Sequence, residues 1–186
     1  MLMSSPVVIV LAGGKGERFT RAGASGHKLD ARIGADSVLG HVLRAVDDAG
    51  LRWHLVRPAG GTSGMGVSIT QGVRATAEAS GWLLLPADLP LIRPASLQAV
   101  AAGLAQYSVV VPWYRQQHGH PVGFGRRWLP QLLALSGDTG AKAIVHTART
   151  ENEVYDLALD DAGITFDIDT PDDLRAARLH SHTERR

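Results

Sequence analysis

The feature that most constrains the fold of this chain is an apolar run that ends abruptly in glycines near the N-terminus. Residues 7–12 read Val-Val-Ile-Val-Leu-Ala, and residues 13–18 read Gly-Gly-Lys-Gly-Glu-Arg. A short run of β-branched residues is typical of a strand buried in a parallel sheet. The glycines predict a turn whose backbone N–H groups can close on an anion, because no Cβ stands in the way.

Basic residues around this turn indicate that the anion is a nucleoside triphosphate. Lys15, Arg18 and, further on, Lys28 bring positive charge to the same region. Two familiar phosphate-binding motifs are excluded. Phe19 stands where the dinucleotide motif needs its third glycine, and Leu29 follows Lys28 where a P-loop needs Ser or Thr. The alternative interpretation is a tight strand-to-helix turn that carries surface charges.

Composition and charge exclude several other classes of protein. The formal net charge of +1 gives no overall attraction to nucleic acid or to a membrane surface. The absence of cysteine rules out disulfides, thiolate metal sites and a cysteine nucleophile. No apolar run is long enough to span a bilayer, and the N-terminus lacks the pattern of a signal peptide. We therefore expect a cytoplasmic protein with neither nucleic acid nor a membrane as its partner.

Apolar runs alternate with helix-like stretches along the whole chain. The sequence predicts strands over residues 7–12, 53–56, 82–85, 108–112, 153–157 and 164–168. It predicts helices over residues 38–49, 66–79, 95–105, 127–135, 141–146 and 171–179. This alternation predicts an α/β fold in three layers, with a mostly parallel, Rossmann-like sheet covered by helices on both faces. We expect a single domain over residues 1–179 and a polar C-terminal tail over 180–186.

A first acidic signal follows one of the predicted strands. Asp88 comes shortly after the apolar run at residues 82–85, between Pro86 and Pro90. The prolines stiffen the loop, and ligands of such sheets bind beyond the carboxyl ends of the strands. A carboxylate fixed beside a triphosphate is a natural ligand for Mg²⁺. The alternative is a loop aspartate that accepts hydrogen bonds from nearby backbone N–H groups.

A second acidic signal, Asp167 and Asp169, lies near the C-terminus. On a strand these two side chains would project to one side while Ile168 projects to the other, and either could complete a metal site with Asp88. Asp169 is the favoured ligand because it stands nearer the carboxyl edge, but a purely structural role stays open for both. Residues 170–173 have a structural explanation as a helix start, with a threonine N-cap, a first-turn proline and two aspartates.

Three weaker signals also bear on a binding site. A glycine-rich loop that enters a helix contains Gly66 and Ser68, which could contact a base or ribose, although the loop could equally be a flexible connection. His118 and His120 alone make a poor metal site, and a loop that faces a bound substrate is the preferred interpretation. Residues 137–142 fit a turn and a helix cap, or a second contact with an anion.

Taken together and in this order, these segments resemble the MobA-like nucleotidyltransferases, which attach a nucleotide to the molybdenum cofactor. The GHPV and GDTGA segments look most like the cytidylyltransferase branch, whereas LAGG looks more like the guanylyltransferase branch, so the choice of base stays open. The resemblance implies the fold of the nucleotide-diphospho-sugar transferases. The matching segments span nearly the whole chain: residues 11–19 (LAGGKGERF), 28–29 (KL), 64–69 (GMGVSI), 85–91 (LPADLPL), 119–122 (GHPV), 137–141 (GDTGA) and 167–171 (DIDTP).

The resemblance implies a Mg²⁺-dependent transfer of CMP or GMP, from CTP or GTP, to the terminal phosphate of molybdopterin, with release of pyrophosphate. It also implies a molybdoenzyme or its chaperone as a protein partner. Asp88, Asp169 and Asp167 would hold Mg²⁺, and Arg18, Lys28 and Asp88 would be the catalytic residues. The substrates would contact the glycine turn and the later loops, at Leu11, Ala12, Gly13, Gly14, Lys15, Gly16, Gly66, Ser68 and His120.

One departure from the family pattern is substantial. Family members carry an extra strand and helix between their second strand and the GMG loop, whereas here residues 53–58 run almost straight into Gly60. We expect part of the wall of the nucleotide pocket to be missing with that unit. Two alternatives therefore stay open. One is a nucleotidyltransferase for a sugar phosphate or another small phosphorylated acceptor, and the other is a nucleotide- or cofactor-binding domain without turnover.

Overall fold

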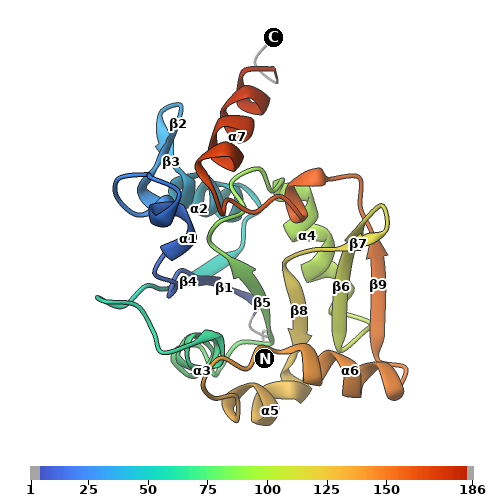
Figure 1. The fold of residues 1–186 in the computed structure, drawn as a ribbon. Coiled ribbons are helices and arrows are strands. Elements are labelled where there is room, and N and C mark those ends of the chain that lie inside the picture. The colour runs from blue at the N-terminus through green and yellow to red at the C-terminus, as the bar shows by residue number, and fades with distance from the viewer. Residues whose placement is uncertain (1–4, 184–186) are drawn as a thin grey trace.

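A seven-stranded sheet forms the centre of the protein in a computed structural model that describes residues 5–183 (Figure 1). Its strands are β1 (Val7–Leu11), β4 (Arg52–Val56), β5 (Gly81–Pro86), β6 (Val109–Tyr114), β7 (Gln117–His118), β8 (Val122–Gly125) and β9 (Val154–Ala158). They run in the order β4-β1-β5-β8-β6-β7, and β9 pairs with β6. The pairs of β1 with β4 and β5 and of β6 with β9 are parallel, whereas β8 is antiparallel to both its neighbours. A separate two-stranded sheet joins β2 (Arg32–Ile33) and β3 (Asp36–Ser37).

Helices cover both faces of the large sheet and enclose two hydrophobic cores. They are α1 (Glu17–Arg21), α2 (Val38–Asp48), α3 (Met65–Ala75), α4 (Pro94–Gly103), α5 (Leu129–Leu133), α6 (Lys142–Thr150) and α7 (Pro171–Thr183). Buried residues of α2, α4 and α7 form one core, and those of α3, α5 and α6 form the other. The alternating side chains of β1 serve both, since Val8 and Val10 face the first core and Val7 and Ile9 face the second. The predicted three-layer, mostly parallel, Rossmann-like fold is confirmed.

Helix starts follow the capping signals of the sequence. The Ser37 hydroxyl accepts a hydrogen bond from the Gly40 N–H at 2.9 Å and caps α2. At the start of α7, the Asp173 carboxylate accepts from the N–H groups of Asp169 and Thr170, each at 2.9 Å. Partial burial alone would raise the pKa of Asp173, but these donors hold it below its usual value. The structural interpretation of residues 170–173 is therefore confirmed.

The strand predicted over residues 164–168 is wrong. A short 3₁₀ helix spans Ala162–Ile164, and within the described part of the chain residues 165–170 pair with no strand. Ile164 and Ile168 are both fully buried, so their spacing reflects two anchors in the core rather than a pleated strand. Gly163 lies so close to Leu91 that a Cβ on it would come within 2.2 Å of the Leu91 carbonyl oxygen. Packing of this segment against the loop after β5 overrides its strand-like pattern.

Further elements differ from the prediction, among them the two-residue strands β2, β3 and β7, which were not predicted. β8 was not predicted, because its two glycines are unfavourable for a strand; Gly123 in fact lets α4 approach, since a Cβ there would lie 3.0 Å from Val100 Cγ1. The short α1 was not predicted either. α7 continues to Thr183, so residues 180–183 of the predicted polar tail are helical, and residues 184–186 lie outside the described part of the chain.

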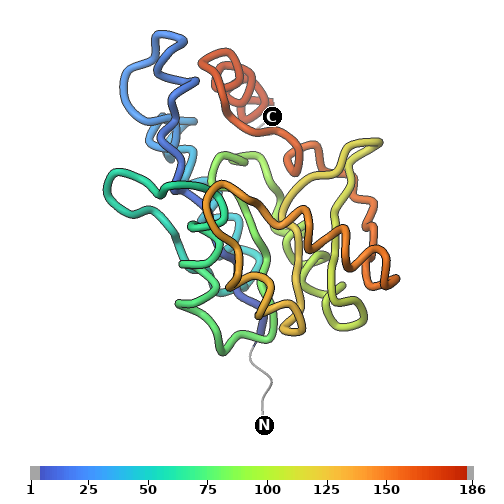
Figure 2. The backbone as a smooth tube through the Cα atoms, turned by 60° about the horizontal axis from the view of Figure 1, so that its bottom comes forward, coloured from blue at the N-terminus to red at the C-terminus, as the bar shows by residue number. Residues whose placement is uncertain are grey.

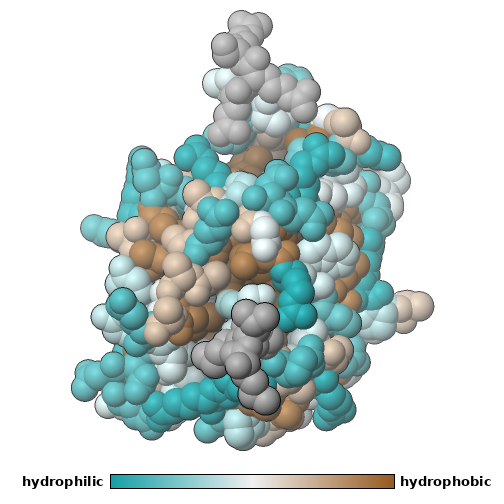
Figure 3. Space-filling view, turned by 180° about the vertical axis from the view of Figure 1, so that it is seen from behind, coloured by the Kyte–Doolittle hydropathy of each residue, from teal (hydrophilic) through white to brown (hydrophobic). Residues whose placement is uncertain are grey.

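The surface of the protein carries both hydrophilic and apolar side chains. The face shown in Figure 3 carries many hydrophilic side chains, with apolar ones visible between them. Within residues 5–183, no helix has both the length and the apolar character that crossing a membrane requires. The large apolar side chains that are exposed include a stacked pair, Tyr107 and Tyr155, whose ring centroids lie 4.8 Å apart. The others are Trp53, Met65 and Leu179.

Candidate active site

The glycine turn after β1 forms one wall of a cavity of about 660 Å³. A Cβ on Gly13 would come within 2.5 Å of Ser68 Oγ and 2.7 Å of Thr62 Oγ1, so only glycine fits there. Gly16 has a φ of 65°, in the left-handed region that favours glycine. Close packing around Gly13 and the left-handed conformation of Gly16 thus fix the shape of the turn. The predicted residues that line this cavity are Leu11, Gly13, Gly14, Lys15, Gly16, Arg18, Lys28, Ser68 and Asp169.

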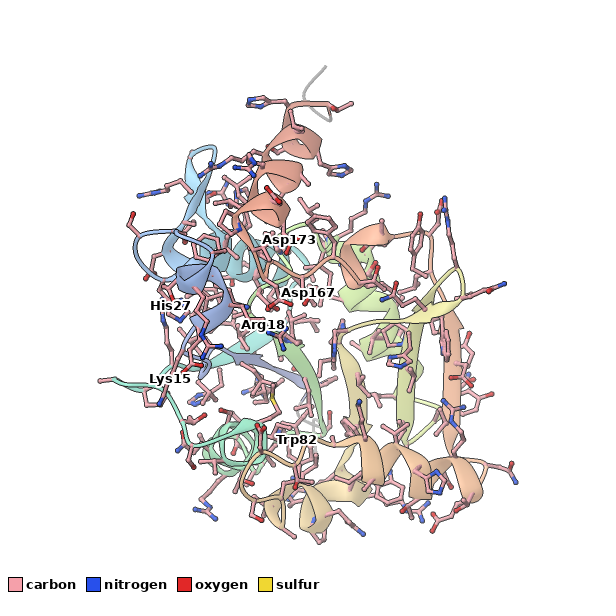
Figure 4. The ribbon with its side chains drawn as sticks, viewed as in Figure 1. Lys15, Arg18, His27, Trp82, Asp167 and Asp173 are labelled. Carbon is pink, nitrogen blue, oxygen red and sulfur yellow. The ribbon has the colours of Figure 1, made fainter. Side chains whose placement is uncertain are left out.

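Three carboxylates gather beside the cavity, as the sequence predicted. One oxygen each of Asp88, Asp167 and Asp169 lies within 4.8 Å of the others. Lys28 Nζ lies 2.9 Å from Asp88 Oδ2 and 3.3 Å from Asp169 Oδ1, and Arg18 contacts the other Asp169 oxygen at 3.2 Å. Figure 4 shows Arg18 and Asp167 close together although they come from segments far apart in sequence, whereas Lys15 lies farther away, to the left in this view.

Backbone hydrogen bonds hold this carboxylate cluster (Asp88, Asp167 and Asp169) in place. The Ala87 N–H donates to the Leu11 carbonyl at 3.0 Å, which ties the loop after β5 to the end of β1. The Ile168 N–H donates to the Asp88 carbonyl at 2.9 Å, which ties the two acidic segments together. The fully buried Ile168 side chain anchors the second segment. The cluster therefore forms at the carboxyl edge of the sheet without the strand that was predicted to present it.

Charges in the cluster shift the pKa values of Lys28 and Asp167. Burial alone would lower the pKa of Lys28, but the charges and hydrogen bonds of Asp88 and Asp169 raise it above its ordinary value. Partial burial raises the pKa of Asp167, and the negative charges of Asp88 and Asp169 raise it further against its backbone hydrogen bond. Lys28 is therefore held as a cation among carboxylates that repel one another.

The donor set of the cluster fits a hard divalent cation. Its ligands are all carboxylate oxygens, and Mg²⁺ and Mn²⁺ favour oxygen ligands over nitrogen or sulfur. The ammonium group of Lys28 already lies among these oxygens, which shows that the position attracts positive charge. Asp88, Asp167 and Asp169 are thus the residues that would hold such an ion.

The loop between β4 and α3, together with the first turn of α3, forms the opposite wall of the cavity. Ser68 is buried, and its hydroxyl pairs with Thr62 Oγ1 at 2.6 Å. Gly66 faces away from the cavity toward the 136–139 loop, where a Cβ would come within 2.6 Å of the Ser136 carbonyl oxygen. In Figure 2 these two loops lie side by side, and the Asp138 carboxylate accepts from the Met65 N–H at 3.2 Å. Ser68 therefore helps to hold the loop before α3 in place through Thr62, and Gly66 allows the 136–139 loop to pack closely against this wall.

Two other predicted residues lie outside the main cavity. Ala12 is buried beneath the glycine turn, and its N–H donates to the Val56 carbonyl at 2.9 Å. His120 lines a second, largely apolar cavity of about 260 Å³, which shares Leu11 with the first and also contains Trp113. The His120 side chain reaches solvent, but the surrounding cavity walls displace bulk water and lower its pKa, against the opposing effect of the Asp88 charge.

Several residues that line the main cavity were not predicted. Thr62 and Ser63 belong to the loop before α3, Met65 is the first residue of α3, and Asp138 belongs to the GDTGA segment, for which the sequence offered only a general anion contact as one alternative. The glycine content of both segments marked them as loops near a ligand, but their mutual contact joins parts of the chain 73 residues apart. No local pattern reports such a contact.

Comparisons with known proteins agree with this geometry. A mostly parallel α/β sheet with a glycine turn beyond its first strand is an architecture typical of nucleotide-binding proteins. Within that class, residues 48–154, more than half of the chain, match the MobA-like NTP transferase domain. The chain belongs to this family, and the resemblance seen in its motifs is confirmed. A comparison with curated proteins gives no significant match.

Solved structures of other proteins share the whole fold. Rv0371c from Mycobacterium tuberculosis H37Rv has a TM-score of 0.76 at 24% identity, over 96% of this chain and 100% of that one. A structure of Rv0371c described as a complex with manganese has a TM-score of 0.68 at 22% identity, over 95% and 99%. A nucleotidyl transferase from Methanothermobacter has a TM-score of 0.76 at 21% identity, over 99% and 100%. At these identities the likeness concerns the fold.

Proposed function

We propose that this protein transfers CMP or GMP, from CTP or GTP, to the terminal phosphate of molybdopterin and releases pyrophosphate, with Mg²⁺ as the metal. The observation that carries the proposal is one cavity bordered by a glycine turn with two basic residues, Lys15 and Arg18, and by the carboxylate cluster with Lys28. Membership of the MobA-like family and the manganese complex of a protein with the same fold support it.

The reaction joins an oxygen of the acceptor phosphate to the α-phosphorus of the nucleotide. The bond between the α-phosphorus and the bridging oxygen to the β-phosphate breaks, and pyrophosphate leaves with the electron pair. A phosphate nucleophile is already ionised near neutral pH, so no general base is needed. Catalysis then consists of positioning and of neutralising charge.

Each group at the cavity has a role in this scheme. Lys15, Arg18 and the amides of residues 13–16 would neutralise the β- and γ-phosphates as pyrophosphate leaves, and Lys28 would contact the α-phosphate. A divalent ion on the carboxylate cluster would stabilise negative charge on the phosphates. The second cavity, with His120 at its wall and Leu11 shared with the first, would receive the acceptor.

The short connection between β4 and α3 bears on the alternative of a binding domain without turnover. In the structure β4 ends at Val56 and α3 begins at Met65, with neither a strand nor a helix in between. The connection nevertheless lines the cavity through Thr62 and Gly64, and the Thr62 N–H donates to the Gly13 carbonyl at 3.0 Å. The remaining loop thus supplies the wall itself, which favours an intact nucleotide site.

The proposal is tested by measuring pyrophosphate release with each of four nucleoside triphosphates and Mg²⁺, with and without molybdopterin. We expect release with CTP or GTP only when molybdopterin is present. Release with a sugar phosphate in place of molybdopterin would assign the protein to a different acceptor. Binding of a triphosphate with no release under any condition would contradict the proposal and favour the binding domain.

Arg18→Ala is expected to weaken the binding of a nucleoside triphosphate about tenfold more than that of the monophosphate. The Arg18 guanidinium is exposed at the cavity wall, beside the glycine turn, where it can reach only the distal phosphates in this scheme. Calorimetric titration of both nucleotides measures the difference. Arg21→Ala is the matched control, because Arg21 pairs with Glu17 on the same helix. Equal losses for the two nucleotides would place Arg18 away from the β- and γ-phosphates.

Asp169→Ala is expected to raise the Mg²⁺ concentration required for activity more than Asp167→Ala does. Asp169 lines the main cavity and contacts both Lys28 and Arg18, whereas Asp167 lies beside it. Loss of a direct ligand weakens metal binding outright, whereas loss of a neighbouring partner costs about 10–100-fold. Titration of activity with Mg²⁺ in the two variants gives the order. The reverse order would make Asp167 the second ligand.

A further inference from the structure

Lys28 occupies the position among the carboxylates that a metal ion would need. Its ammonium nitrogen lies 2.9 Å from Asp88 Oδ2 and 3.3 Å from Asp169 Oδ1. The side chain is only 15% exposed, so water screens these contacts weakly. Arg18 also contacts Asp169, but its side chain is 78% exposed. Lys28 is therefore the more buried of the two cations that contact the cluster.

The lysine and a divalent ion compete for the same oxygens. Mg²⁺ takes carboxylate oxygens at about 2.0–2.1 Å, so it would draw on the oxygens of Asp88 and Asp169 that the ammonium group now contacts. Two cations so close would also repel each other in a partly buried site. Binding of the divalent ion therefore favours displacement of the ammonium group.

We infer that Lys28 is a built-in placeholder for the metal, which holds Asp88 and Asp169 together in the free protein and must be displaced before a divalent ion binds. The inference rests on the proposed function, because it concerns the same cluster. It assigns Lys28 two positions. In the free protein its ammonium neutralises the carboxylates, and with metal bound it is released toward the phosphates of the nucleotide.

A consequence is that metal and nucleotide help each other to bind. The metal frees the ammonium group for the phosphates, and a nucleotide offers that group a new anionic partner outside the cluster. This coupling is reciprocal. If bound metal raises the affinity for the nucleotide by some factor through Lys28, bound nucleotide raises the affinity for the metal by the same factor. The free protein then has a low affinity for the metal alone.

The test measures Mn²⁺ binding without nucleotide, from the electron paramagnetic resonance signal of free Mn²⁺. We expect Lys28→Met to bind Mn²⁺ at least about tenfold more tightly than the unaltered protein, because the competing cation is gone. Arg21→Met removes the same charge from an exposed pair nearby and is expected to stay within about twofold. Circular dichroism and thermal melting check that both variants fold.

Equal or weaker Mn²⁺ binding by Lys28→Met would overturn the inference, as would an equal gain in Arg21→Met. These outcomes are separate from a failure of the proposed function. The pyrophosphate screen can fail while Lys28→Met still gains affinity, and the screen can succeed while the affinity stays unchanged.

A second measurement needs no variant. The lysines of this chain are Lys15, Lys28 and Lys142. Brief acetylation followed by peptide mass spectrometry reports how accessible each amine is. Adding saturating Mn²⁺ is expected to increase the labelling of Lys28 severalfold and to leave the exposed Lys142 unchanged. An unchanged rate at Lys28 with Mn²⁺ bound would show that the ammonium stays in place and would overturn the inference.

Discussion

Asp88→Asn is expected to lower the rate of nucleotidyl transfer about a thousandfold while the protein stays folded. The change keeps the shape of the side chain and removes the negative charge that Lys28 contacts at 2.9 Å and that a metal would need. Electrostatic groups at such centres contribute several kcal/mol to the transition state. Steady-state pyrophosphate release at saturating Mg²⁺ measures the loss, and circular dichroism checks the fold.

The matched control for this variant is Asp172→Asn. Asp172 lies in the first turn of α7, pairs with Arg175 and is largely exposed outside the cluster. Its loss is expected to leave the rate within about twofold, because exposed pairs contribute little. Near-normal turnover in Asp88→Asn would remove Asp88 from the metal site.

Asp161→Ala is expected to reduce the free energy of unfolding by about 3–5 kcal/mol. Asp161 is 4% exposed and accepts hydrogen bonds from the Arg93 N–H, the Ser96 hydroxyl and the Gly163 N–H, at 3.0, 2.7 and 2.8 Å. Truncation would leave these donors unsatisfied, and bonds to a charged acceptor contribute about 1.5–3 kcal/mol each. Urea unfolding followed by circular dichroism measures the change.

The neighbouring Asp160 provides the control, because its side chain is exposed. Asp160→Ala is expected to change the free energy of unfolding by about 0.5 kcal/mol or less. A loss below about 1 kcal/mol in Asp161→Ala would show that water replaces the carboxylate and that the segment before Asp167 is held by its apolar anchors instead.

Residues that act together at the site could be predicted only where they follow a recognisable strand or turn. The glycine turn and Asp88 follow buried strands, so their position at the carboxyl edge came from the strand pattern alone. The prediction grouped Asp167 and Asp169 correctly with Asp88, but it did so by assigning them to the end of a strand, and their segment is not a strand. A hydrogen bond from the Ile168 N–H to the Asp88 carbonyl oxygen holds their segment in place. These two residues are 80 positions apart, and a periodic sequence pattern does not indicate such a contact.

Other features depend on contacts that become visible only in three dimensions. β8 carries two glycines, and its place between β5 and β6 is set by the close approach of α4 to Gly123. The sequence marked Lys28 as a phosphate ligand, but nothing local indicates that it pairs with two aspartates 60 and 141 positions later. Likewise, His120 was grouped with the substrate-facing residues, and the structure assigns it to a separate cavity.

The close contact between the segment around the start of α3 and the 136–139 loop limits how either of them can change. A Cβ on Gly64 would come within 2.4 Å of the Gly137 carbonyl oxygen, and one on Gly66 within 2.6 Å of two carbonyl oxygens of the same loop. A change of sequence or length in either loop therefore requires a matching change in the other. Grafting either loop alone from a relative would therefore bring in only one of the two surfaces that pack against each other.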